Sequence, residues 1–129
     1  MDLDLGPLLA RVPSLVAVYA FGSRASGLAR PDSDLDLALL APRPLDPLAR
    51  FDAQQALAAA LGTDIDLVDL ASASTVMRAE VLRTGRVLHD ADPTARAFWE
   101  VHAMSAYALL NEERRGILDD VHRRGRVYA

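Results

Sequence analysis

The sequence contains no cysteine, which excludes disulfides, thiolate nucleophiles and cysteine-ligated metals. It also lacks a basic excess, because 14 Lys and Arg residues stand against 18 Asp and Glu residues, giving a net charge of −4. No direct nucleic-acid binding is therefore expected, and any nucleotide must be held locally. The sequence has no uninterrupted run of about 18 apolar residues and no basic segment before its first apolar region. We expect a cytoplasmic protein without membrane attachment.

The composition is that of an ordinary folded chain, with 51% hydrophobic and 25% charged residues among 129. This length is enough for one domain with a proper core. We therefore expect a single domain over residues 1–129, with a core at about 8–90 and a C-terminal helical segment at about 92–129.

The apolar patterns predict alternating strands and helices. Strands are expected at 15–21, 34–40 and 63–70, with a shorter one at 86–89. Helices are expected from Pro47 to Gly62, from 74 to 84, and from Pro93 toward 116 or 124. The expected fold class is α/β (α+β), a small mixed sheet with helices packed against it.

Two aspartates lie one residue apart at the start of the second expected strand. Side chains at i and i+2 of a strand share a face, so Asp34 and Asp36 point the same way. Two carboxylates about 4 Å apart near a protein surface repel by roughly 4 kcal/mol, so the pair calls for a cation or a raised pKa. With oxygen ligands alone, Mg²⁺ or Mn²⁺ fits best.

The third expected strand repeats this spacing at Asp64 and Asp66. If the second and third strands are neighbours, Asp66 joins Asp34 and Asp36 as a third carboxylate on a platform for one or two divalent ions. Such a platform orients a nucleoside triphosphate for displacement at phosphorus. Asp64 and Asp69 are expected to be structural or exposed, with Asp69 on the opposite face from Asp66.

Gly22 and Ser23 follow the first expected strand. A glycine there lets the backbone approach a ligand, and amides at a helix start together with a serine hydroxyl donate to phosphate. The next residue, Arg24, is a further candidate for pairing with phosphate oxygens. These three residues are the candidate nucleotide-binding residues, although a glycine-serine pair alone is also typical of an ordinary turn.

These motifs carry a family resemblance. The segment GSRASGLARPDSDLDL (22–37) resembles the Gly-Ser and Asp-x-Asp signature of the DNA polymerase beta nucleotidyltransferase superfamily, and IDLVDL (65–70) resembles its third-carboxylate strand. The small size and short helical extension are similar to the minimal nucleotidyltransferases, the MntA-like antitoxins of prokaryotes. The resemblance covers about 15–90 well, and it implies a nucleotidyltransferase-like fold.

The resemblance implies an enzyme that transfers AMP from ATP to a tyrosine hydroxyl of a HEPN-domain ribonuclease toxin. This modification silences the toxin. The toxin is expected to be encoded by a neighbouring gene. The two proteins are expected to be able to form a hetero-oligomer. Gly22 and Ser23 would then hold the triphosphate, Asp34 and Asp36 would bind Mg²⁺ or Mn²⁺, and Asp66 would bind metal and help to deprotonate the acceptor. Two alternatives stay open: modification of a small hydroxylated molecule such as an aminoglycoside, and a non-catalytic antitoxin that acts by contact alone.

Other candidate residues favour plainer interpretations. An apolar stripe in the C-terminal helix is typical of a face that packs on the sheet, and partner contact is the alternative; it comprises Phe98, Trp99, Val101, Met104 and Leu109. Tyr19 is expected to be buried. The three histidines lie in separate elements without ligand spacing and receive no role; they are His89, His102 and His122.

Overall fold

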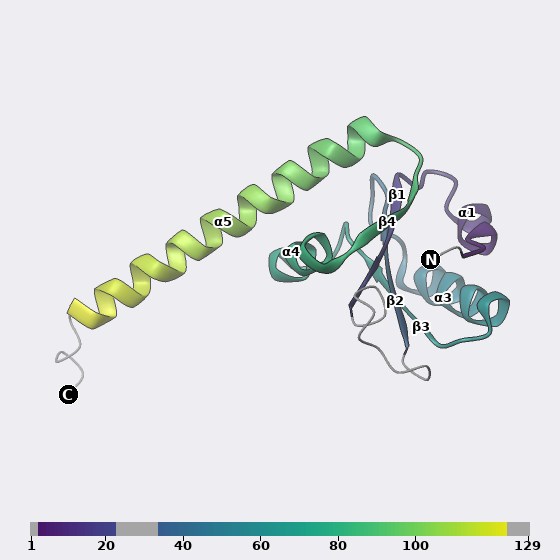
Figure 1. Cartoon of the computed structure of the whole chain (residues 1–129), viewed down its shortest axis with the longest axis horizontal. Helices are drawn as coiled ribbons and strands as arrows, with labels where there is room; N and C mark the ends of the chain where they lie inside the picture. The colour runs from purple at the N-terminus through teal and green to yellow at the C-terminus, as the bar shows by residue number, and fades with distance from the viewer. Residues whose placement is uncertain (1–2, 23–33, 124–129) are drawn as a thin grey trace.

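A four-stranded mixed sheet forms the centre of the molecule in the computed structural model, which describes residues 3–22 and 34–123 (Figure 1). The strands are β1 (Ala17–Phe21), β2 (Leu35–Leu40), β3 (Ile65–Asp69) and β4 (Arg86–Asp90). The helices are α1 (Gly6–Arg11), α3 (Pro47–Leu61), α4 (Thr75–Thr84) and α5 (Pro93–Arg123). The expected fold class, a small mixed sheet with helices and a helical C-terminal segment, is confirmed.

The strand order is β3-β2-β1-β4. Strand β1 pairs antiparallel with both β2 and β4, whereas β2 and β3 are parallel and are connected through α3. A parallel pair needs such a crossover connection, which the alanine-rich helix supplies. The second and third predicted strands are therefore neighbours, as the prediction that Asp66 lies beside Asp34 and Asp36 requires.

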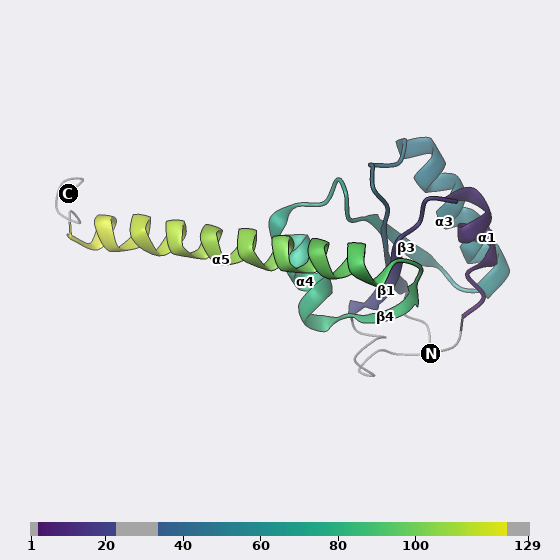
Figure 2. The same cartoon turned by 90° about the horizontal axis from the view of Figure 1, so that it is seen from above.

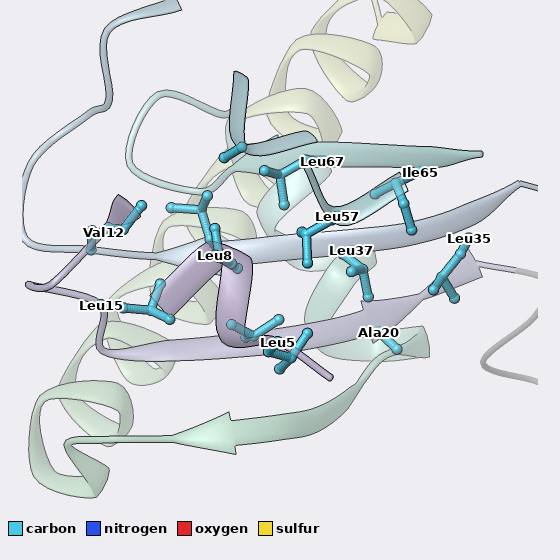
Figure 3. Packing of buried hydrophobic residues seen from close by; sticks show 14 residues of the cluster. Leu5, Leu8, Val12, Leu15, Ala20, Leu35, Leu37, Leu57, Ile65 and Leu67 are labelled. Carbon is cyan, nitrogen blue, oxygen red and sulfur yellow. The ribbon is translucent and has the colours of Figure 1, made fainter. Parts of the chain in front are cut away.

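Helices α1 and α3 cover one face of the sheet. Alternate side chains of the strands meet Leu8 of α1 and Leu57 of α3 in this layer, and both leucines are completely buried (Figure 3). The sheet side chains in the cluster include Val18, Ala20, Leu35, Leu37, Leu39, Ile65 and Leu67. Because successive side chains of a strand point to opposite faces, the residues between them on each strand must face the other side of the sheet.

Helix α4 and the first half of α5 cover the other face. Val81 of α4 is fully buried against Tyr19, Ala38 and neighbouring sheet residues, and Trp99 of α5 packs at the edge of this second cluster. The rings of Tyr19 and Trp99 lie 6.2 Å apart at a tilt of 43°. Both faces of β1 and most of β2 are therefore buried, which explains their continuous apolar runs.

The helix ends follow the signals in the sequence. Asp46 caps α3 by accepting a hydrogen bond from Leu48 N, Pro47 occupies the first turn, and Gly62 ends the helix in the left-handed conformation at φ +67°. Ser74 caps α4 by accepting from Met77 N. The predicted helices from Pro47 to Gly62 and from 74 to 84 are confirmed.

Two features of the helices differ from expectation. Helix α1 was not predicted, because six residues give too short a pattern for helical periodicity to be recognised. The expected packing of the C-terminal stripe on the sheet is wrong for all but Trp99, since its other members are exposed: Phe98, Val101, Met104 and Leu109. The sequence pattern could not reveal that α5 extends away from the sheet (Figure 2).

Within residues 3–22 and 34–123, no helix combines the length and apolar character needed to cross a membrane.

Candidate active site

Asp36 and Asp66 lie side by side on the two parallel strands. They are register partners between β2 and β3. Their neighbours Leu35, Leu37 and Ile65 fill the α1/α3 cluster, so strand alternation directs both aspartates to the opposite face. Asp36 is partly buried and Asp66 is exposed, which leaves the pair open on one side.

The negative charges of two further carboxylates act on Asp36. Burial raises the pKa of Asp36 above its ordinary value, and the negative charges of Asp66 and Asp34 raise it further. Asp34 is exposed and immediately precedes β2. A cation beside Asp36 would relieve both the repulsion and the cost of partial burial.

Gly22, which directly follows β1, lies close to the carboxylate of Asp36. Phe21, the last residue of β1, is the register partner of Asp36, and Gly22 follows with φ +74°. A Cβ atom on Gly22 would overlap Asp36 Oδ2. Glycine is needed here both for the positive φ and for the close approach.

The donor set suits a hard divalent cation that arrives with a nucleotide. Carboxylate oxygens are the ligands Mg²⁺ and Mn²⁺ prefer. No three His, Cys, Asp or Glu side chains of the described part of the chain form a ready-made metal cage. Mg²⁺ usually takes one or two carboxylates and completes its shell with phosphates and water, so the residues present fit an ion shared with a triphosphate.

The remaining predicted residues fall into two groups. Ser23 and Arg24 lie outside the described residues. Asp64 is exposed and is not among the charges that shift Asp36, whereas Asp69 is buried on the α1/α3 side, where it accepts hydrogen bonds from Leu45 N at 2.7 Å and Ala71 N at 3.1 Å. The structural interpretation of Asp69 is confirmed.

A second polar cluster was missed by sequence reasoning. Glu100 Oε1 accepts hydrogen bonds from Tyr19 OH at 2.9 Å and from an Arg96 terminal nitrogen at 2.7 Å, while Arg96 Nε donates to Asp90 at 2.9 Å. Burial, reinforced by Glu100, raises the pKa of Tyr19. The i,i+4 spacing of Arg96 and Glu100 was a signal for their pairing, but nothing in the sequence indicated that Tyr19 would join them.

This cluster borders a cavity of about 560 Å³ between α4 and α5. Glu80 and Arg83 of α4 line one side, and Met104 and Tyr107 of α5 line the other. The lining does not include Asp36 or Asp66, so the cavity is separate from the carboxylate pair.

Comparison with protein families gives a match over residues 4–94 to the polymerase beta nucleotidyltransferase model. This region contains Gly22, Asp34, Asp36 and Asp66. It ends just after the start of α5.

Comparison with individual proteins adds three similar chains. Protein adenylyltransferase MntA of Shewanella oneidensis is 43% identical over 110 residues, which is 85% of this chain and 78% of that protein. A toxin–antitoxin crystal structure with AMP-PNP contains a chain with 39% identity and a TM-score of 0.77, covering 93% of this chain and 99% of the other. A structure of the tri-AMPylated S. oneidensis HEPN toxin in complex with MNT antitoxin gives 38% identity and a TM-score of 0.74, covering 92% of each chain.

Proposed function

The chain belongs to the polymerase beta nucleotidyltransferase family and to its minimal, MntA-like branch, and from this we propose that it transfers AMP from ATP to a tyrosine hydroxyl of a HEPN-domain toxin. The observation that carries the proposal is the pairing of Asp36 with Asp66 in register, with Gly22 against the Asp36 carboxylate. The relatives solved with an ATP analogue and with an AMPylated HEPN toxin support the choice of donor and acceptor.

The residue roles follow from the chemistry of the transfer. The tyrosine oxygen forms a bond to the α-phosphorus of ATP while the bond from that phosphorus to the bridging oxygen breaks, and pyrophosphate leaves. We assign the tyrosine proton to Asp66, because a phenol with an ordinary pKa near 10 needs a base or a metal to attack at neutral pH. Asp34 and Asp36, with Asp66, would hold the divalent ion.

The ion, Mg²⁺ or Mn²⁺, would neutralise phosphate charge and orient the α-phosphate when it is bound. Gly22 would bring its backbone close to the triphosphate. Ser23 and Arg24 stay candidates for the same task on sequence grounds.

The decisive experiment follows label from ATP to the toxin. The purified chain is incubated with Mg²⁺, ATP labelled at the α-phosphate and the HEPN-domain protein encoded beside it. We expect label on the toxin, none with ATP labelled only at the γ-phosphate, and none after chelation of the divalent ion. Asp36→Asn should abolish labelling, whereas the exposed Asp64→Asn should retain it.

The same assay separates the enzyme from a contact-only antitoxin. If Asp36→Asn neutralises the toxin as well as the wild type does, the catalytic proposal is wrong. If a purified aminoglycoside accepts label and the toxin does not, the acceptor has been assigned wrongly.

We keep two further expectations as proposals. A single domain with a core at 8–90 and a helical extension from 92 accords with the family match over 4–94, and limited proteolysis tests it. A cytoplasmic location accords with ATP as the donor, and cell fractionation tests it.

A further inference from the structure

Strand β3 forms one edge of the sheet, so part of its backbone has no neighbouring strand to pair with. The hydrogen bonds near its two ends show which of its residues face β2. Asp64 O accepts a hydrogen bond from Leu35 N. Leu70 N donates to Leu39 O. Because alternate residues of a strand direct their N–H and C=O groups to opposite sides, the backbone groups of Leu67 face the outer edge of β3.

Two side chains of α3 hold these outward backbone groups. Gln54 Oε1 accepts a hydrogen bond from Leu67 N at 3.0 Å, and a terminal nitrogen of Arg50 donates to Leu67 O at 3.1 Å. The same Arg50 nitrogen donates to Gln54 Oε1 at 3.3 Å. Both side chains are half-buried where α3 runs beside β3 (Figures 1 and 2). We name Arg50 and Gln54 the edge clamp.

The bonding partners of Gln54 fix the orientation of its amide. Leu67 N and the Arg50 guanidinium are both donors, so the atom between them must be the amide oxygen. The contact requires an acceptor at this position. A glutamate would meet that requirement with the same reach, and a leucine of similar size would not.

The edge clamp acts next to the carboxylate on β3. The N–H that Gln54 holds belongs to the peptide bond between Asp66 and Leu67. On its other side Asp66 is the register partner of Asp36 in β2. The Asp66 side chain is exposed and accepts no hydrogen bond from the described residues, so its direction depends on how its backbone is held.

We propose that Gln54, supported by Arg50, is a positioning residue that orients Asp66 for AMP transfer; this rests on the proposed function. Gln54 bonds to backbone on the outer edge of β3, and its effect on the reaction passes through Asp66. Groups that orient a metal ligand typically change metal affinity or activity by about 10- to 100-fold when they are removed. A small misplacement of a reacting group is costly for the same geometric reason.

The edge clamp also has a plainer consequence. Filling the outward hydrogen bonds of an edge strand stabilises that strand and hinders pairing with the edge of another chain. Such a structural role does not depend on which side chain stands at position 66. An experiment that compares the effect of Gln54 with and without Asp66 therefore separates the two roles.

Neighbouring glutamines provide matched variants. Gln54→Leu removes the acceptor and keeps the approximate size, whereas Gln55→Leu makes the same exchange at the next position, which is exposed. Gln54→Glu keeps the acceptor and is the conservative rescue. Leucine, glutamine and glutamate have similar helix propensities, so α3 itself is little affected.

The kinetic test follows transfer of AMP from ATP labelled at the α-phosphate to the HEPN-domain protein encoded beside the chain. We expect Gln54→Leu to lower kcat by about tenfold or more, with the KM for toxin little changed. Gln54→Glu and Gln55→Leu should stay within about twofold of the wild type. All assays are run at a temperature where each variant is folded by urea unfolding. Arg50→Met, which loses the bond to Leu67 O, replaces Gln54→Leu if that variant does not fold.

Two further measurements do not depend on turnover. Amide exchange followed by NMR should be faster at Leu67 N in Gln54→Leu and unchanged in Gln54→Glu, because only the first variant loses the acceptor. The affinity for an equimolar mixture of Mn²⁺ and AMP-PNP is measured calorimetrically. We expect Gln54→Leu to weaken it by about tenfold in the wild type, and by less than about twofold when Asp66→Asn is already present.

Three outcomes would overturn the positioning role. These are faster exchange at Leu67 in Gln54→Leu with unchanged kcat and Mn²⁺–AMP-PNP affinity, equal losses of affinity with and without Asp66, and equal damage from Gln55→Leu. A wild type whose Mn²⁺–AMP-PNP affinity depends on Gln54 through Asp66, but which transfers no label to the toxin, would sink the proposed function and leave the positioning of Asp66 in place.

Discussion

Gly22 touches the carboxylate of Asp36 so closely that a Cβ atom on the glycine would overlap Asp36 Oδ2. Gly22→Ala must therefore either move Asp36 or shift the end of β1, and it must also hold φ at +74°. We expect AMP transfer to fall at least about 100-fold, because a small misplacement of reacting groups is costly. The loss of stability should be about 1–3 kcal/mol, measured by urea unfolding.

Gly62→Ala is the matched control for this effect. Gly62 has nearly the same φ, +67°, but nothing lies within 4 Å of its Cβ position at the end of α3. This variant should lose about 1–2 kcal/mol of stability and keep its transfer rate at a temperature where it is folded. Equal loss of activity in both variants would mean that strain alone, and not the contact with Asp36, explains the need for Gly22.

Asp36→Asn should make the metal-free protein more stable at neutral pH while it abolishes transfer. The pKa of Asp36 is raised in the folded state by burial first and then by Asp66 and Asp34. The folded state thus binds the Asp36 proton more tightly than the unfolded chain, and stability falls as pH rises from the ordinary Asp pKa of about 3.9 through the raised value. Above this window the ionised group imposes its full cost, which asparagine removes.

The measurement is the difference in Tm between variant and wild type across pH in buffer with a chelator. We expect a gain of a few degrees at pH 7 that shrinks toward zero below about pH 4. A lower Tm for Asp36→Asn at pH 7 would contradict the electrostatic account. With ATP and Mg²⁺ present, the wild type should gain stability and the variant should not.

Much of the site was predictable because strand parity is local. The i,i+2 spacing places Asp34 and Asp36 on the same face of the strand. The spacing of three residues places Asp66 and Asp69 on opposite faces. The start of α3 at Pro47 and its end at Gly62 are likewise short-range signals, and the structure bears them out.

The features that sequence could not supply all depend on contacts between distant segments. The close approach of Gly22 to Asp36 arises from antiparallel pairing of β1 and β2, and the hydrogen bond from Leu45 N to Asp69 spans 24 residues. The exposed stripe of α5 looked like a core face because helical periodicity records which side is apolar and not what covers it. Only the direction in which α5 leaves the sheet decides that.

Asp69→Asn should destabilise the fold without removing the chemistry. Both carboxylate oxygens of this buried residue accept backbone hydrogen bonds, from Leu45 N and Ala71 N, and an amide can replace only one of these acceptors. We expect a loss of about 2 kcal/mol in urea unfolding, with near-normal transfer at low temperature. Asp46→Asn serves as the control, because asparagine caps helices as well as aspartate does.

Asp66→Asn and Asp64→Asn change two exposed aspartates two residues apart, and together they test the role proposed for Asp66. Asp66 is the register partner of Asp36 and its charge raises the pKa of Asp36, while Asp64 contributes no resolved effect there. Asp66→Asn should lower kcat at least about 100-fold, because under the proposed mechanism Asp66 is both an ion ligand and the base. Asp64→Asn should stay within about twofold of the wild type.

The pH dependence of transfer gives this pair a second readout. If Asp66 accepts the tyrosine proton, the residual activity of Asp66→Asn should rise steadily with pH toward 10, because only the spontaneously ionised phenol then reacts. Asp64→Asn should keep the wild-type profile. Equal damage from both substitutions, or a pH profile of Asp66→Asn that matches the wild type, would remove Asp66 from the role of base and leave it only as a ligand of the divalent ion.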